Sequence, residues 1–202
     1  MEIFKTLNTL GLDKQEFKNF FEKDSKLFLF KSSHFKIIFS SLKKYDIKSQ
    51  EVFSMIKQYP EMLIANRESL LEKKLKLLDE LIPQKSTMRT LLRMYPFILL
   101  KSYNSFVKKV LYFNKELEKN IIDLDIFPII FVFNFNTEIK PRCELMRRLN
   151  SWMPFKEAFS LTPEEFTKKL NVDLIEFERL KEDSSPLFER DLLFRYNKYI
   201  GI

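Results

Sequence analysis

Apolar and charged residues alternate along most of the chain with the period of an amphipathic α-helix. Between residues 70 and 81 the leucines fall largely on one helical face, while lysines and glutamates fall mostly on the other. Another helix is predicted over residues 49–58, ending just before Tyr59-Pro60. The proline ring removes a hydrogen-bond donor and disfavours helical geometry in the preceding residue. The apolar turn PEMLI follows, about the length of a 3₁₀ segment.

This pattern of two helices and a short turn repeats along the chain. Aromatic-proline pairs occur at Tyr59-Pro60, Tyr95-Pro96 and Phe127-Pro128, so the prolines lie 36 and 32 residues apart. An earlier repeat around Ser25 keeps the surrounding pattern without the proline. Each repeat then has two apolar residues at one shared place: Leu27 and Phe28, Met62 and Leu63, Ile98 and Leu99, Ile130 and Phe131. Because one helix pair cannot bury its apolar face alone, the repeats are expected to stack as an all-α, curved α-solenoid.

The segment DIFPIIFVFNFN, residues 125–136, has the composition of a β-strand. Its Phe127-Pro128 pair nevertheless falls on the proline position of the repeat, and Ile130 and Phe131 fall on the two apolar positions. The segment is therefore interpreted as the third proline turn. Phe133 and Phe135 exceed what the other repeats bury, so they are the first residues to consider for a partner contact.

Composition narrows the class of protein further. The chain has 202 residues with 22 Phe and only 2 Gly. Scarce glycine disfavours a turn-rich β fold and a Gly-rich phosphate loop, because both need positions with positive φ. The uncharged stretch between Asp125 and Glu138 is shorter than the roughly 20 residues of a bilayer span, so no membrane helix is expected.

The sequence contains no constellation typical of an enzyme or a metal site. Cys143 is the single cysteine and His34 the single histidine, which excludes intrachain disulfides, Cys/His zinc sites and most nucleophile-histidine catalysis. Thr162-Pro163-Glu164-Glu165 is a capping box with proline at the first helical position, so its carboxylates are expected to serve the helix start. We therefore expect no enzymatic activity, no cofactor and no metal.

Positive charge is concentrated in the first three quarters of the chain. The formal net charge is +7; residues 1–150 hold 27 Lys/Arg against 18 Asp/Glu, and residues 151–202 hold 8 against 10. The basic part is thus the candidate surface for a polyanion. The pairs Lys73-Lys74 and Lys108-Lys109 lie 35 residues apart at one position of the repeat.

Several of these features together resemble the mTERF family, the organellar transcription termination factors. They are Leu10-Gly11-Leu12, the tandem turns YPEML and YPFIL, and EIKPRCELMRRL followed by LTPEEFTKKL. The last two resemble the family's C-terminal signature, an Arg-Ile-x-Pro-Arg segment and then a helix with Glu-x-Phe; Ile139, Pro141 and Arg142 match, and Glu138 replaces the first arginine. The resemblance covers roughly residues 6–170.

The resemblance implies a fold of helical repeats, each with two α-helices and a short 3₁₀ turn, over residues 1–170, and we expect residues 171–202 to cap them. It also implies nucleic-acid binding in organellar gene expression, as transcription termination or regulation on double-stranded DNA or as binding of ribosomal RNA. The expected compartment is the mitochondrion, with the plastid as alternative; the N-terminus has no recognisable presequence. We expect a monomer.

Two other functions stay open. One is a structural or assembly component of the mitochondrial ribosome that binds ribosomal RNA, and the other is a protein-protein scaffold of helical repeats. Mitoribosomal or transcription proteins are the protein partners that these functions imply. The predicted nucleic-acid contacts are basic residues on the second helices and in the signature: Arg67, Lys73, Lys74, Lys108, Lys109, Lys140, Arg142, Arg147 and Arg148.

Overall fold

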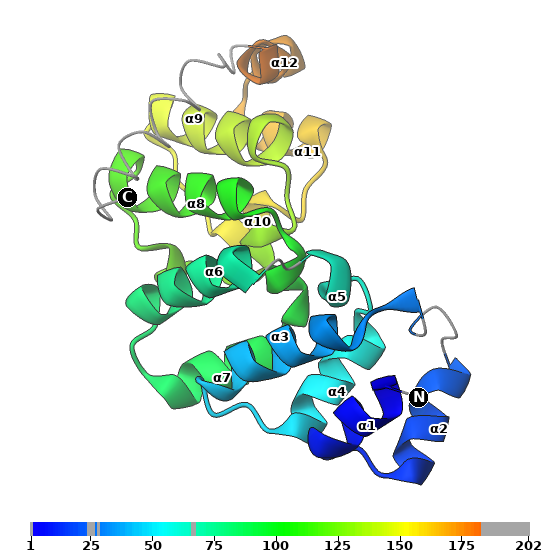
Figure 1. Cartoon of the computed structure of the whole chain (residues 1–202). Coiled ribbons are helices and arrows are strands. Elements are labelled where there is room, and N and C mark those ends of the chain that lie inside the picture. Colours follow the sequence, from blue (N-terminus) through cyan, green and yellow to red (C-terminus); the bar gives the residue numbers. More distant parts are fainter. Residues whose placement is uncertain (1, 24–26, 28, 66–67, 183–202) are drawn as a thin grey trace. The chain divides into compact units, whose positions relative to one another are not determined.

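The computed structural model describes residues 2–23, 27, 29–65 and 68–182. It divides into two compact units, unit 1 (Met1–Tyr103) and unit 2 (Asn104–Ile202). Every regular element of the described residues is helical (Figure 1). The predicted all-α fold is therefore confirmed.

Unit 1 is built around the long helix α3. This helix packs against α1, α4, α5 and α6, while α6 packs against α7, and the 3₁₀ turn η2 contacts α5 and α7. The elements of unit 1 are α1 (Glu2–Thr9), α2 (Lys14–Lys23), α3 (Ser32–Lys43), α4 (Ser49–Gln58), α5 (Met62–Ala65), α6 (Glu68–Leu81), α7 (Lys85–Met94) and η2 (Pro96–Leu100).

The predicted amphipathic pattern accounts for the core of unit 1. Leu71, Leu75, Leu77 and Leu78 of α6 are buried, and α4 ends at Gln58, just before Tyr59-Pro60, as expected. The turn that begins at Pro96 is a 3₁₀ helix, which agrees with the short 3₁₀ turn predicted for each repeat. The turn PEMLI instead leads into a short α-helix, α5, which starts at Met62, so the predicted 3₁₀ geometry is wrong here.

Unit 2 centres on α9, most of which is buried between η6 and α12. Helix α8 starts at the last residue of unit 1 and continues into a π-helical turn, η3. The elements are α8 (Tyr103–Leu111), η3 (Tyr112–Glu116), η4 (Ile121–Asp123), η5 (Ile129–Phe131), the π-helical turn η6 (Phe135–Ile139), α9 (Lys140–Arg148), α10 (Phe155–Ala158), α11 (Pro163–Leu170) and α12 (Leu174–Glu182).

The segment of residues 125–136 is a helical turn, as its place in the repeat predicts. Pro128 precedes η5, and the chain then enters η6 and α9. Phe135 is buried against Tyr112 with ring centroids 5.0 Å apart, and half-buried Phe133 packs on Phe159 at 4.8 Å. Phe135 is thus a core residue, and its burial argues against a partner contact there.

Local signals define the ends of the helices. The Thr162 side chain accepts a hydrogen bond from the Glu165 amide, and the Glu165 carboxylate accepts one from the Thr162 amide, so the predicted capping box is confirmed. Asn171 after α11 and Asn150 after α9 adopt positive φ, the left-handed conformation that commonly ends helices. Helix α12 packs on α9 and α11, and the rest of the predicted C-terminal cap, residues 183–202, lies outside the described residues.

No helix in the part of the chain that the structure describes is long and apolar enough to cross a membrane.

Candidate nucleic-acid interface

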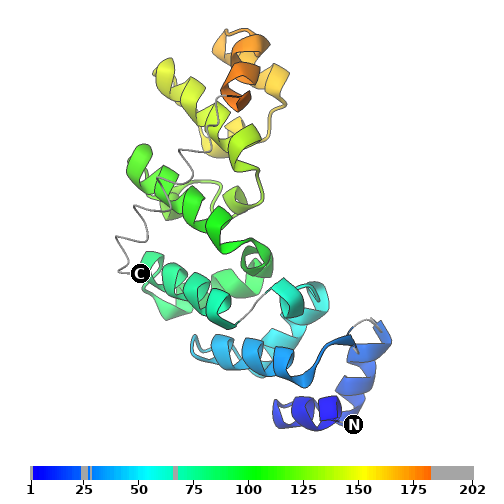
Figure 2. The same cartoon turned by 45° about the horizontal axis from the view of Figure 1, so that its top comes forward.

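The exposed sides of α3 and α6 carry four lysines. On α3, Lys36, Ser40 and Lys43 are spaced four and three residues apart and form one exposed stripe opposite the buried side of the helix. On α6, Lys73 and Lys76 form a similar stripe. The two helices pack against each other and lie side by side in both views (Figures 1 and 2). We call Lys36, Lys43, Lys73 and Lys76 the α3/α6 lysine face.

These lysines are available to an external anion. Within the described residues, no side chain of the lysine face forms an ion pair or hydrogen bond. The adjacent Lys44 does, because its Nζ lies 2.6 Å from Glu72 Oε1 and so joins the end of α3 to α6. Exposed Glu80, one turn beyond Lys76, bounds the face on α6. The surface between these limits keeps an excess of positive charge.

The two units differ sharply in charge. Residues 1–103 contain 19 Lys/Arg against 12 Asp/Glu, whereas residues 104–202 contain 16 against 16. Unit 1 therefore carries the whole net charge of +7. Unit 1 therefore has an excess of positive charge, whereas positive and negative residues balance in unit 2.

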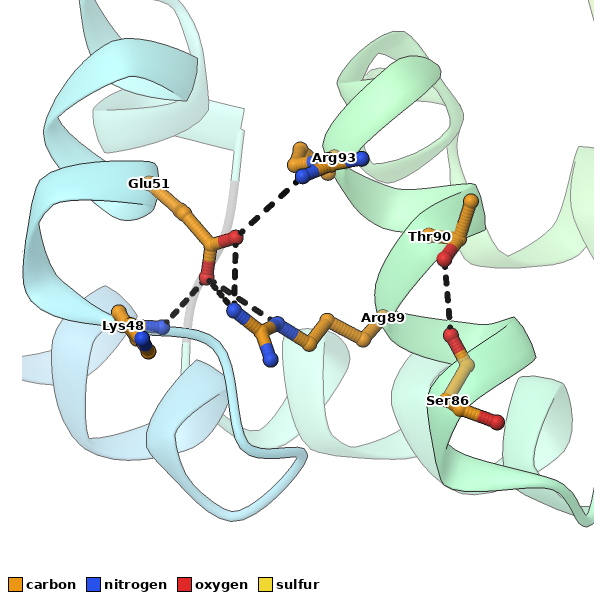
Figure 3. Close-up of polar contacts among 6 residues, drawn as sticks. All are labelled: Lys48, Glu51, Ser86, Arg89, Thr90 and Arg93. Carbon is orange, nitrogen blue, oxygen red and sulfur yellow. Dashed lines mark hydrogen bonds and ion pairs between the residues drawn. The ribbon is translucent and has the colours of Figure 1, made fainter.

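Other basic residues of unit 1 are used internally (Figure 3). Arg89 of α7 donates through Nε and Nη2 to the Glu51 carboxylate of α4, at 3.0–3.2 Å, and Arg93 approaches the same carboxylate at 3.9 Å. Glu51 also accepts from the Lys48 amide at the start of α4. The hydrogen bond from Arg89 is the main reason that the pKa of Glu51 is lowered. This network holds the first helices of two successive repeats together.

Lys74 and Lys109, predicted as phosphate contacts, point into the protein. Each is 2 % exposed. Lys74 Nζ donates to the Leu99 carbonyl at 2.7 Å, and Lys109 Nζ donates to the carbonyls of Phe131 and Phe133 at 2.9 and 2.6 Å. Burial lowers the pKa of Lys74 to about 8. We therefore correct the assignment of both lysines, since buried ammonium groups bound to backbone carbonyls do not face a ligand.

Lys108 and Arg142 are also internal. Lys108 is 8 % exposed; its Nζ donates to Asn136 Oδ1 at 2.9 Å and lies 4.2 Å from the centroid of the Phe135 ring. Arg142 is 5 % exposed and donates to the carbonyls of Ala158 and Leu161, both at 3.0 Å. Because both cationic groups are buried and hydrogen-bonded within the protein, both residues are also removed from the predicted phosphate contacts.

The surroundings of Arg142 explain the C-terminal signature in physical terms. Its guanidinium carbon lies 5.4–5.5 Å from the ring centroids of Phe159, Phe166 and Phe177. Phe166 is the aromatic residue of the Glu-x-Phe segment, so the two halves of the signature meet at this contact. The backbone carbonyl of Glu138 also accepts from Arg142, at 3.4 Å, a contact that does not depend on which side chain stands there.

The other predicted contacts differ in exposure. Lys73, Arg147 and Arg148 are exposed, and Lys140 is half-buried. Arg147 pairs with buried Glu144, which also accepts from the Tyr112 hydroxyl at 3.2 Å. Arg67 lies outside the described residues.

Lys36, Lys43 and Lys76 were missed from the sequence because they do not recur at one position of the repeat. The 35-residue recurrence singled out the lysine pairs that include Lys74 and Lys109 as phosphate contacts. Exposure on the helix surface is the property that distinguishes lysines able to reach a phosphate. The helical spacing from Lys36 to Lys43, on the side opposite the apolar residues, could have identified the α3 stripe.

Comparison with protein-family models identifies the family of this chain. The family model mTERF matches residues 1–167. The chain belongs to the mTERF family. Searches of curated proteins and of solved structures gave no significant match.

Membership makes this mTERF protein part of a family of non-enzymatic, nucleic-acid-binding proteins that are typically organellar and built from helical repeats. In the described part, Cys143 is fully buried, which raises the pKa of its thiol, and no three His, Cys, Asp or Glu side chains gather as a metal site.

Proposed function

We propose that this mTERF protein binds the phosphate backbone of double-stranded or folded nucleic acid through the α3/α6 lysine face. The observation that carries the proposal is the set of four exposed lysines on two adjacent helices, without an ion-pair partner among the described residues. The concentration of net charge on unit 1 supports the same surface.

Lysine determines the mode of binding. An ammonium on a flexible stem acts as a point charge, whereas the bidentate contacts that identify guanine usually come from arginine. Lysines that neutralise phosphates release condensed counterions, which gives affinity without reading sequence. The lysine face therefore supports binding that depends on charge and shape.

In unit 2, exposed Arg148 is a further candidate for phosphate contact. It has no ion-pair partner among the described residues, whereas Arg147 is already paired with Glu144. Lys140 is half-buried and already has an interaction of its own. We assign Arg148 a supporting phosphate contact on unit 2, separate from the lysine face of unit 1.

Within the cell, we propose a role in mitochondrial gene expression. Two ligands fit this binding mode: organellar double-stranded DNA, with transcription termination or regulation as the function, and ribosomal RNA, with ribosome assembly or structure as the function. Crosslinking in isolated organelles, followed by sequencing of bound nucleic acid, separates them. Reads from ribosomal RNA alone contradict termination, and reads from one DNA locus contradict a ribosomal role.

The lysine face itself is tested by fluorescence anisotropy with duplex DNA and duplex RNA between low and moderate salt. Changing Lys36, Lys43, Lys73 and Lys76 together to Gln is expected to reduce the slope of log K against log salt by about three to four, since each phosphate contact contributes roughly 0.9.

The matched control removes the same charge from exposed lysines elsewhere, by changing Lys57, Lys85, Lys156 and Lys168 to Gln. We expect this control to keep most of the slope. Equal loss in both variants means that net charge alone drives binding, and an unchanged slope in the first variant removes the lysine face from the site.

The alternative function is a scaffold for other proteins. Ile129 and Val132, three residues apart at η5, are 44 % and 52 % exposed, and such apolar side chains favour protein contact. Absence of binding to both duplexes at low salt, together with a protein crosslinked at these two residues, would favour the scaffold.

A further inference from the structure

The same contact, from a buried basic side chain to a backbone carbonyl, recurs in three successive repeats. Lys74 of α6 reaches the Leu99 carbonyl, Lys109 of α8 reaches the Phe131 carbonyl, and Arg142 of α9 reaches the Ala158 carbonyl. Each donor belongs to the long second helix of a repeat, and each acceptor belongs to the short turn helix of the next repeat.

All three acceptors lie at the carboxyl end of their short helix. Leu99 is the penultimate residue of η2, Phe131 is the last residue of η5, and Ala158 is the last residue of α10. Carbonyl groups at this end have no acceptor role within their own helix, and they carry the negative end of its dipole. A buried cation satisfies them and complements that dipole.

We propose that this position is an inter-repeat capping site, in which a buried cation from one repeat completes the turn helix of the next. Each turn helix then depends on the preceding repeat for its order. The position couples neighbouring repeats in one direction along the chain, from donor helix to following turn. This role is separate from nucleic-acid binding. It means that three positive charges stabilise the fold.

Extra contacts at two of the three sites agree with a capping function. Lys109 also donates to the Phe133 carbonyl, and Arg142 also donates to the Leu161 carbonyl. These acceptors lie two and three residues beyond the end of the respective short helix. At these two sites the cationic side chain therefore binds more than one carbonyl where the chain leaves the short helix.

The first repeat lacks the cation. Phe35, Phe39 and Leu42 of α3 are buried with the spacing of Leu71, Leu75 and Leu78 of α6, and in this register buried Ile38 occupies the place of Lys74. The capping site is therefore present at the turn helices that follow α6, α8 and α9, and it is absent at α5.

Hydrogen exchange on the full chain tests the proposal, because opening of a turn helix exposes its own amides. For Lys109→Met we expect the Phe131 and Val132 amides, which bond to the Pro128 and Ile129 carbonyls, to exchange about ten to a hundred times faster. For Lys74→Met the same increase is expected at the Ile98 amide, which bonds to the Tyr95 carbonyl.

The adjacent lysines provide matched controls. Lys73→Met removes an exposed lysine and is not expected to accelerate exchange at the turn amides by more than about threefold. Lys108→Met removes a buried lysine that binds the Asn136 side chain, so its effect is expected outside the Phe131 and Val132 amides. Lys109→Arg keeps a cation in place, and we expect it to keep most of the protection.

Two results would overturn the inference. One is unchanged exchange at the turn amides in Lys74→Met and Lys109→Met, and the other is a uniform increase throughout the compact unit that holds the substitution, as general destabilisation produces. If Lys109→Met does not fold, Lys74→Met and Lys109→Arg decide: equal protection of the Ile98 amide in Lys74→Met and Lys73→Met, or loss of turn protection in Lys109→Arg, contradicts capping by the cation.

Discussion

Replacing Arg142 by methionine separates a structural role from phosphate contact at the most buried arginine of the signature. The substitution keeps a long side chain among Phe159, Phe166 and Phe177 and removes the guanidinium. It also leaves the Ala158 carbonyl without this donor. If Arg142 caps α10, stability falls, whereas a phosphate contact would affect only binding.

The structure allows the loss of stability to be bounded. An unsatisfied buried carbonyl costs about 1–3 kcal/mol, and Ala158 is fully buried, whereas half-exposed Leu161 can bind water in place of the guanidinium. Loss of the cation from three rings is partly offset by contacts of the methionine sulfur. Burial also lowers the pKa of Arg142, so methionine removes a desolvation cost. Because the acceptors remain after the donor is lost, we expect a net destabilisation of about 2–4 kcal/mol.

Urea and thermal unfolding, followed by circular dichroism, measure this loss. About 3 kcal/mol corresponds to a decrease in Tm of roughly 10 °C for a chain of this size. Arg148→Met, an exposed residue of the same helix, is the control and is expected to change stability by less than about 0.5 kcal/mol. A structural role for Arg142 is refuted if Arg142→Met is as stable as the control and instead loses affinity for duplex DNA or RNA.

Three further predictions concern charge and pH. Lys73→Met is expected to reduce the salt slope of duplex binding by about 0.9, whereas Lys74→Met is expected to leave it unchanged, so equal effects would contradict their different placement. The pKa of Lys74 is about 8 in the folded chain, below its ordinary value of 10.5, so the unfolded chain binds more protons between pH 8 and 10.5. The free energy of unfolding of wild type, relative to that of Lys74→Met, is therefore expected to rise over this pH range. A difference that stays constant in urea titrations argues against burial of Lys74. Glu51→Gln is expected to lower the free energy of unfolding by about 1 kcal/mol at pH 7. Because the hydrogen bond from Arg89 lowers the pKa of Glu51, the difference from wild type is present above pH 4.5 and is lost as the pH falls below it. Unfolding measured from pH 7 to 3 checks this.

Local patterns predicted most of the fold. Proline at position 60 ends α4, the apolar face of α6 is buried, and the capping box at Thr162 starts α11. These features depend on neighbouring residues, so a single sequence contains them. The geometry of the PEMLI turn was not predictable in this way, because 3₁₀ and α-helical turns differ by one hydrogen-bond register that packing selects.

The basic residues were harder to assign, because the same residue type serves two roles at adjacent positions. Lys73 is exposed and Lys74 is buried, although both were candidates on charge and recurrence. The sequence did contain a distinguishing signal. Lys74 lies three residues after Leu71 and four before Leu78, within the apolar stripe of its helix, whereas Lys73 lies off that stripe.

The same phase identifies the other two capping cations. Lys109 lies three residues after Phe106 and four before Phe113, and Arg142 has the same relation to Ile139 and Met146. A basic residue in phase with the buried stripe of a repeat is thus better interpreted as a donor to backbone carbonyls than as a phosphate contact. Recurrence of such a residue then reports the stacking of repeats, while the charge available to nucleic acid is counted from lysines out of phase with the stripe, as on the α3/α6 lysine face.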